Sequence, residues 1–279
     1  MSVINTNVKA LIAQQSLVVN ERSLSNSMQQ LSTGKRINGA ADDAAGLAIS
    51  AKFTAQIKGL NQAVRNANDA ISMIQTAEGA MDAVTSMLVR MRELSVQSAN
   101  GTNSSSDRTS IQAEFEQLQT EIRRVAANTE WNGNAVLALS ASGTGSAVVF
   151  QIGANSSQTL TVNFQSLSSD VTGMTQVVGA ANTAFSAGFA DAQTKLDAAI
   201  NGVNSFRGTL GAAMNRLTYA ADVAVNISTN TAASRSRILD ADYAQATTEL
   251  ARSQIIQQAG TAMLSQANQS PYTVLALLR

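Results

Sequence analysis

Residues 31–50, LSTGKRINGAADDAAGLAIS, contain two hydroxyl residues beside a Gly-Lys pair, the residue types of a phosphate-binding loop. A Walker A loop also needs Ser or Thr directly after the lysine, so that the hydroxyl reaches Mg²⁺, and a buried strand that leads into the loop. Here Arg36 follows Lys35, and the preceding residues 17–31 have helical spacing. The stretch therefore does not predict a nucleotide site.

Backbone chemistry explains the same stretch as a bend between two helices. Gly34 suits a helix C-terminus, where φ is positive, and Asp42 and Asp43 suit the start of the next helix as cap and dipole partners. Two adjacent carboxylates lack the alternating oxygen ligands of a calcium loop, and the Asp-Ala-Asp run at 240–242 lacks them too. We expect no metal site and no cofactor.

The composition excludes several kinds of chemistry. The 279 residues contain no histidine and no cysteine, which removes Ser-His-Asp and Cys-His catalysis, HExxH zinc sites and disulfides. We find no nucleophile paired with a base, so we expect no catalytic residues and no enzyme. The net charge is zero and no apolar run reaches transmembrane length, so we expect neither nucleic-acid binding nor membrane insertion.

Apolar spacing predicts long helices. Apolar residues recur at steps of three or four over residues 57–91, 111–125 and 196–227. The only proline is Pro271, so residues from about 55 to Ala99 predict one helix about 65 Å long. Ser106 or Asp107 is expected to cap the helix that follows.

Residues 140–180 differ from the rest, because they are rich in Gly, Ser and Thr. Leu160, Val162 and Phe164 alternate with polar residues, and residues 155–158 suit a turn, so we expect a small β-hairpin region. The fold class is mainly α: an elongated antiparallel helical bundle or coiled-coil rod formed by the N- and C-terminal segments. The predicted domains are a terminal coiled coil (1–40 and 243–279), a connecting spoke (41–56 and 232–242), a helical core (57–139 and 182–231) and the hairpin region (140–181).

The two terminal helices carry few charges. The last begins near Tyr243, and its Leu250, Ile256 and Met263 are expected on one side, with amide side chains elsewhere. Two amphipathic helices of about 30 residues form only a thin core by themselves. Amide-rich faces can pack on neighbouring copies without burying ions. We therefore expect the termini to gain their order on assembly.

Several long segments, in order, resemble bacterial flagellin. They are INTNVKAL, LSTGKRINGAADDAAGLAIS, MRELSVQSANGTNS, IQAEFEQLQTEI, NTEWNG, SRSRILDADYA, QIIQQAGTAMLSQAN and VLALLR. The resemblance covers residues 1–135 and 182–279 and not the residues between them. Many flagellins carry large outer domains there, so this chain resembles a minimal form with core domains only.

The resemblance implies a subunit that assembles into the flagellar filament for swimming motility. It implies export through the flagellar type III apparatus, without a cleavable signal peptide, to an extracellular filament. The implied partners are further copies of the chain, an export chaperone, the filament cap and hook–filament junction proteins. The terminal helices would form an inner tube and the long helices an outer tube. The residues implied in assembly and chaperone binding are Leu11, Leu24, Leu31, Leu250, Ile256, Met263, Leu264, Leu275 and Leu278.

Arg90, Arg92, Glu93, Leu94 and Glu114 deserve a separate interpretation. Without the resemblance, residues 90–94 indicate a solvated helix face with an intrahelical ion pair. The resemblance implies that this patch forms axial subunit contacts and is sensed by a vertebrate Toll-like receptor. The alternative function is a hook–filament junction protein of related helical build.

Overall fold

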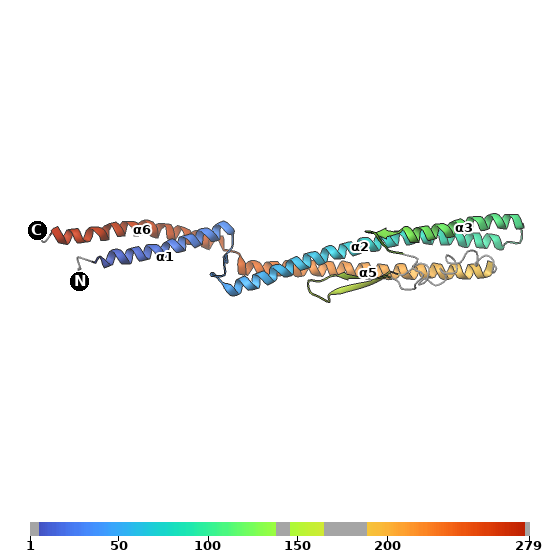
Figure 1. Cartoon of the computed structure of the whole chain (residues 1–279), viewed down its shortest axis with the longest axis horizontal. Helices are drawn as coiled ribbons and strands as arrows, with labels where there is room; N and C mark the ends of the chain where they lie inside the picture. Colours follow the sequence, from blue (N-terminus) through green and yellow to red (C-terminus); the bar gives the residue numbers. More distant parts are fainter. Residues whose placement is uncertain (1–5, 138–145, 165–188, 277–279) are drawn as a thin grey trace. The chain divides into compact units, whose positions relative to one another are not determined.

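The computed structural model describes residues 6–137, 146–164 and 189–276 (Figure 1). The chain forms two compact units, one of residues 1–56 and 229–279 and the other of residues 57–228. Within the described residues, no helix is long and apolar enough to cross a membrane.

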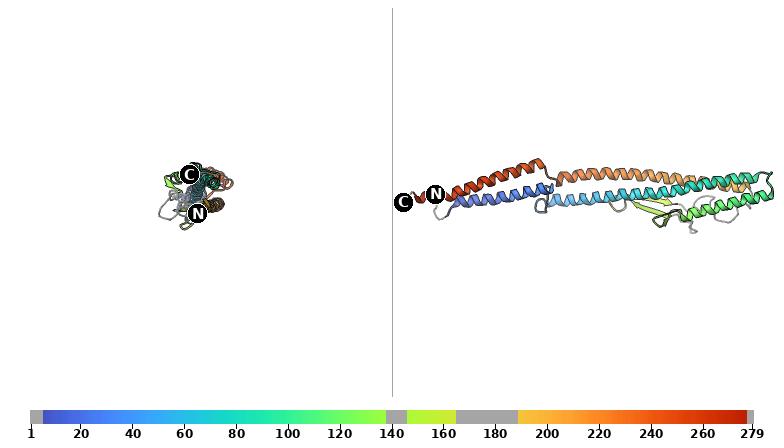
Figure 2. Two further views of the ribbon diagram at one scale, coloured as in Figure 1. Left: turned by 90° about the vertical axis from the view of Figure 1, so that its right-hand side faces the viewer. Right: turned by 90° about the horizontal axis from the view of Figure 1, so that it is seen from above.

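The first unit is built on two terminal helices, α1 (Val8–Thr33) and α6 (Tyr243–Ala276). They lie side by side and run in opposite directions (Figures 1 and 2). Gly34 ends α1 with φ of 67°, and its N–H donates to the carbonyl of Gln30. The predicted glycine C-cap is thus confirmed, as is the start of the last helix at Tyr243.

Backbone hydrogen bonds join the bend after α1 to the chain before α6. The Arg36 N–H donates to the Leu239 carbonyl at 2.7 Å, and the Ala241 N–H donates to the Gly34 carbonyl at 3.0 Å. These two bonds fix the bend end of the terminal pair.

The two aspartates of the bend have different roles. Oδ1 of Asp43 accepts the Gly46 N–H at 2.8 Å at the start of the next helix, which confirms the predicted cap. The capping role predicted for Asp42 is wrong. Its Oδ2 accepts the N–H groups of Asn38 and Gly39, both at 2.9 Å, and so braces the turn. These backbone donors lower the pKa of the Asp42 carboxyl.

Two long helices run through both units, α2 (Ala44–Ala99) and α5 (Phe189–Leu239). The predicted helix start near residue 55 is wrong, because α2 begins at Ala44, about one-fifth of its length earlier. Residues 47–58 hold neither glycine nor proline, so nothing in them interrupts helical hydrogen bonding.

In the second unit, α2 and α5 are antiparallel. The Ser228 hydroxyl donates to Oδ1 of Asn61 at 3.1 Å. Two ion pairs keep the same register toward the other end of the unit: Arg207 with Asp82 at 3.3 Å and Arg92 with Asp197 at 2.6 Å. The largest fully buried side chains include those of Ile74, Met81, Leu88, Ile122 and Phe206.

Helix α3 (Ser105–Asn128) packs on this core through Ile111, Phe115 and Ile122. Its cap is Ser104, so the prediction of Ser106 or Asp107 as the cap is wrong by two or three residues. Asp107 stands at N3 and completes a reciprocal capping box with Ser104. The hydrogen bonds from Ser104 lower the pKa of the Asp107 carboxyl.

The described residues of the second unit also form two antiparallel hairpins. In the first, β1 (Glu130–Trp131) and β2 (Asn134–Ala135) meet at Asn132-Gly133, both with positive φ, as expected for this dipeptide. In the second, β3 (Ser146–Gln151) pairs with β4 (Thr159–Phe164).

The second hairpin confirms the predicted alternation. Leu160, Val162 and Phe164 are buried, and the residues between them are exposed. Nδ2 of Asn66 on α2 donates to the Gln151 carbonyl at 3.0 Å. The hairpin is therefore attached to α2 by both apolar packing and a hydrogen bond.

Candidate functional site

On the faces that α1 and α6 turn toward each other, half-buried leucines alternate with small and polar residues. Asn20, Ser27 and Ser253 are 8%, 5% and 3% exposed, which makes them the most buried residues of this helix pair together with Ala246. Nδ2 of Asn20 donates to the Ser253 carbonyl at 2.8 Å. Such side-chain-to-backbone hydrogen bonds join the pair at positions that alternate with half-buried leucines, the residue type that a coiled coil usually has there.

Many other large apolar residues of the same pair face outward. Their exposed fractions lie between 43% and 65%. A monomeric protein rarely exposes so many apolar side chains in one region unless they contact a partner. These outward residues, here called the outer apolar set, are Val8, Leu11, Ile12, Val18, Val19, Met28, Ile255, Ile256 and Met263.

The assembly residues expected from the sequence divide into two groups. Leu24, Leu31, Leu250 and Leu264 are half-buried between the helices, whereas Leu11, Ile256 and Met263 are exposed. The side chain of Leu275 and the whole of Leu278 lie outside the described residues.

The prediction that Leu250, Ile256 and Met263 share one side of the last helix is wrong. The inward positions of α6 alternate at steps of four and three through Ser253 and Gly260. At Gly260 the small residue lets the two backbones approach. A Cβ added to Gly260 would lie 2.6 Å from Cδ2 of Leu17 on α1. Leu250 follows the same inward steps, whereas Ile256 and Met263 lie outside them.

The predicted charged patch is a network that ties three helices together. Arg90 on α2 binds Glu114 on α3 at 2.9 Å and Glu93 at 3.0 Å. Arg92 binds Asp197 on α5, and these carboxylates raise the pKa of both guanidinium groups. All of these charged side chains remain about half exposed.

Leu94 does not belong to the exposed part of this patch. It is only 1% exposed and packs in the core of the second unit. The stripe that places Leu88 and Met91 in the core reaches Leu94 at the next step of three, so the spacing contained this signal.

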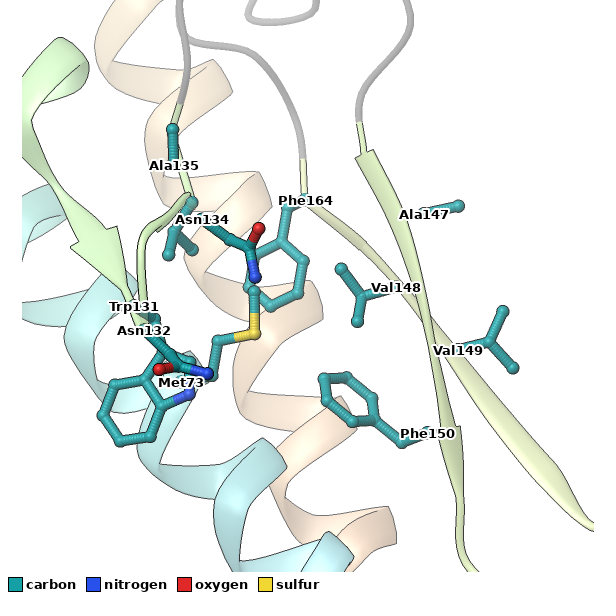
Figure 3. Close-up of a pocket in the computed structure, with 11 residues that line it drawn as sticks. Met73, Trp131, Asn132, Asn134, Ala135, Ala147, Val148, Val149, Phe150 and Phe164 are labelled. Carbon is teal, nitrogen blue, oxygen red and sulfur yellow. The ribbon is translucent and has the colours of Figure 1, made fainter.

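A cavity of about 570 Å³ lies between the two hairpins and α2 (Figure 3). Val148, Phe150 and Phe164 point into it toward Met73, and Ala147 and Val149 point away. The polar side chains among its described lining residues are the amides of Asn132 and Asn134 and the indole N–H of Trp131. None of these lining residues is an acid, a base or a nucleophile, so the cavity offers no group for catalysis.

Across the described part of the chain, no group of three or more His, Cys, Asp or Glu side chains could hold a metal ion. The exposed chemistry of this part is therefore that of surfaces: the outer apolar set and the charged network on α2 and α3.

Comparison with known proteins defines the class. Residues 4–142 match the family model for the bacterial flagellin N-terminal helical region, and residues 194–278 match that for the C-terminal helical region. A flagellin of Halalkalibacterium halodurans is 42% identical over 277 residues, which cover 99% of this chain and 100% of the relative. The flagellar filament 33 kDa core protein of Treponema phagedenis is 42% identical over 294 residues, again covering 99% and 100%.

Among the solved structures with a similar fold is one from another flagellar protein. It is a putative flagellar hook-associated protein from Vibrio parahaemolyticus, with a TM-score of 0.58 over 71% of this chain and 100% of that one. At 15% identity this likeness concerns the fold alone. The family matches and the full-length relatives are flagellar filament proteins, with no support for the hook–filament junction alternative.

These findings define a flagellar structural protein, mainly α and without large additional domains relative to the Halalkalibacterium relative. The chain belongs to the bacterial flagellin family, and it is a structural subunit of the flagellar filament.

Proposed function

We propose that the outer apolar set of α1 and α6 is the surface through which copies of the chain join in the filament. The observation that carries this proposal is the number of large apolar side chains that the terminal pair exposes, although its most buried residues include Asn20, Ser27 and Ser253. Burial of exposed apolar area is the main driving force of protein association. A contact between different surfaces of successive copies, which does not close into a ring, extends into a filament.

The two compact units support an assignment to two layers of the filament. The unit of residues 1–56 and 229–279 would form the inner tube, and the unit of residues 57–228 would form the outer tube. Deletion of residues 250–279 tests the assembly role, because it removes Ile255, Ile256 and Met263. We expect no filaments after seeding or addition of ammonium sulfate, and normal filaments from the truncated chain would refute the assignment.

The ordering of the termini has its own test. In dilute monomer, we expect fast amide hydrogen exchange at both ends of the chain and slow exchange in the second unit. In filaments, both regions should be protected. Strong protection of residues 1–30 in dilute monomer would contradict assembly-dependent order.

For the charged network we propose two contacts on one exposed surface. Arg90, Glu93 and Glu114 keep polar atoms in solvent even while paired, so they remain available to an axial neighbour or to a vertebrate Toll-like receptor. Because Leu94 is buried, it would contribute indirectly, by packing in the core and supporting α2. A reporter-cell assay with purified monomer tests the receptor, and no response at saturating protein would reject it.

We also propose the partners and the destination that family membership supports. The chain would leave the cell through the flagellar type III apparatus without cleavage, bound beforehand by an export chaperone at its last helix. It would then meet the filament cap and the hook–filament junction proteins. The mass of the filament protein tests the uncleaved N-terminus, and a loss of N-terminal residues would count against it. We propose no enzymatic role.

A further inference from the structure

Asn7 uses both ends of its side-chain amide. Its Oδ1 accepts the Ala10 N–H at 3.1 Å and so caps the start of α1. Its Nδ2 donates to the Ala267 carbonyl on α6 at 2.7 Å. One side chain therefore begins α1 and joins it to a helix 260 residues away in the sequence.

The Ala267 carbonyl is available because of the only proline in the chain. In an α-helix, this carbonyl would accept the N–H of the residue four positions later. That residue is Pro271, which has no N–H. A backbone carbonyl left without its helical donor needs another partner, and Asn7 supplies it.

The Asn7 contact lies at the end of the terminal pair that is opposite to the bend. Near the bend, the Tyr243 hydroxyl donates to the Leu31 carbonyl at 3.1 Å. In the middle, Asn20 donates to the Ser253 carbonyl. The three contacts have nearly equal residue spacings on α1 and on α6, in opposite directions along the chain. They therefore belong to one antiparallel register.

The surface beside this contact belongs to the outer apolar set. Lys9, Ile12, Ala13, Met263 and Ala267 contribute to a groove of about 600 Å³ between α1 and α6. Ala267 lines the groove and also accepts the bond from Asn7. A shift of the first turns of α1 along α6 would therefore move Ile12 relative to Met263.

We propose that Asn7 and Pro271 form a lock that fixes the open end of the terminal pair and thereby positions the outer apolar set for contact between copies. The proposal rests on the assembly function proposed above. It goes beyond that function, because it assigns the position of the outer apolar set to the side-chain amide of Asn7 and to the N–H that Pro271 lacks. Asn7 is a positioning residue, since it acts through the surface that it holds in place.

The test uses variants of Asn7 that keep its hydrogen bond to the start of α1 but lose its hydrogen bond to the Ala267 carbonyl. Asn7→Ser keeps a good cap but is too short to reach Ala267. Asn7→Asp also keeps the cap, and its carboxylate cannot donate to a carbonyl. The measured quantity is the critical concentration, the soluble protein left after seeded polymerisation of the full chain. Loss of one hydrogen bond predicts a rise of about fivefold for both variants.

Gln14→Glu is the matched control for the charge that Asn7→Asp introduces. Gln14 is exposed on α1, and the substitution leaves the contact with Ala267 intact. We expect its critical concentration to stay within about twofold of the parent chain. A rise with Gln14→Glu equal to that with Asn7→Asp would assign the effect to charge and overturn the lock.

Pro271→Ala gives the Ala267 carbonyl a helical donor again. The lock predicts that this substitution lowers the critical concentration more in the Asn7→Asp chain than in the parent chain, because only the former has lost its donor. Equal effects in both chains, or parent-like polymerisation of Asn7→Ser, would overturn the lock while filament assembly stands. Failure of the parent chain to extend seeds would instead overturn the assembly function, and the lock with it.

Discussion

Met263→Gln tests the outer apolar set. Glutamine has nearly the length and the helix propensity of methionine, so the substitution changes polarity and little else. Full burial of a methionine side chain is worth about 1.5–3 kcal/mol. Met263 is 65% exposed in the single chain, which leaves about 1–2 kcal/mol to be gained on assembly.

That free energy corresponds to a rise of about 5- to 30-fold in the critical concentration of seeded polymerisation. The stability of the monomer should change by less than about 0.5 kcal/mol, because the side chain is largely in solvent. Val149→Thr is the control, since Val149 is 58% exposed on β3, outside the terminal pair. An unchanged critical concentration for Met263→Gln, or an equal rise for the control, would refute the reasoning.

Three further predictions concern the scaffold. Leu88→Ala removes a side chain that is 0% exposed, and we expect a loss of about 2–5 kcal/mol in unfolding free energy, measured by denaturant titration. Gly59→Leu should detach the second hairpin and lower the melting temperature, because a Cβ on Gly59 would already lie 3.0 Å from Cβ of Ala154; an unchanged melting curve would contradict this. Folding lowers the pKa of Asp42 and Asp107 below 3.8, so their stabilisation is complete above that pH and is lost as pH falls through the folded values. The double variant with Asn at both positions should show a shallower fall of melting temperature between about pH 5 and pH 2.

The helices could be predicted from the sequence because their cause is local. Steps of three and four between apolar residues identify the core face of α3 from Ile111 to Ile122, and the structure buries these residues. Strict alternation in the same way identifies Leu160 and Phe164 on β4. Exact helix ends were less predictable, since Ser104, Ser106 and Asp107 are all good caps. Only the structure shows which side chain accepts a hydrogen bond from the first backbone N–H groups of α3.

The terminal pair could be predicted only in part, because its contacts follow apolar size at the leucine positions and not at the positions between them. The reasoning from spacing assumes that the largest apolar residues mark the inner face of a helix. On α6 that assumption selects Ile256 and Met263, yet Ser253 and Gly260 face α1. The bond between Asn7 and Ala267 joins residues from opposite ends of the chain, and no local pattern contains it.

The polar residues between α1 and α6 also explain why a single chain gains little from folding its ends. A buried asparagine in a helix seam specifies the pairing and lowers its stability, and Asn20, Ser27 and Ser253 contribute almost no apolar burial between α1 and α6. Apart from the half-buried leucines between the helices, the large apolar side chains that could add stability remain largely in solvent until another copy covers them. Stability of the terminal helices and attachment of the next copy then depend on the same side chains. A substitution such as Asn20→Leu should therefore stabilise the isolated pair, measured as slower amide exchange of α1 in the monomer, without lowering the critical concentration to the same extent. Equal gains in both quantities would show that the seam, and not the outer apolar set, limits assembly.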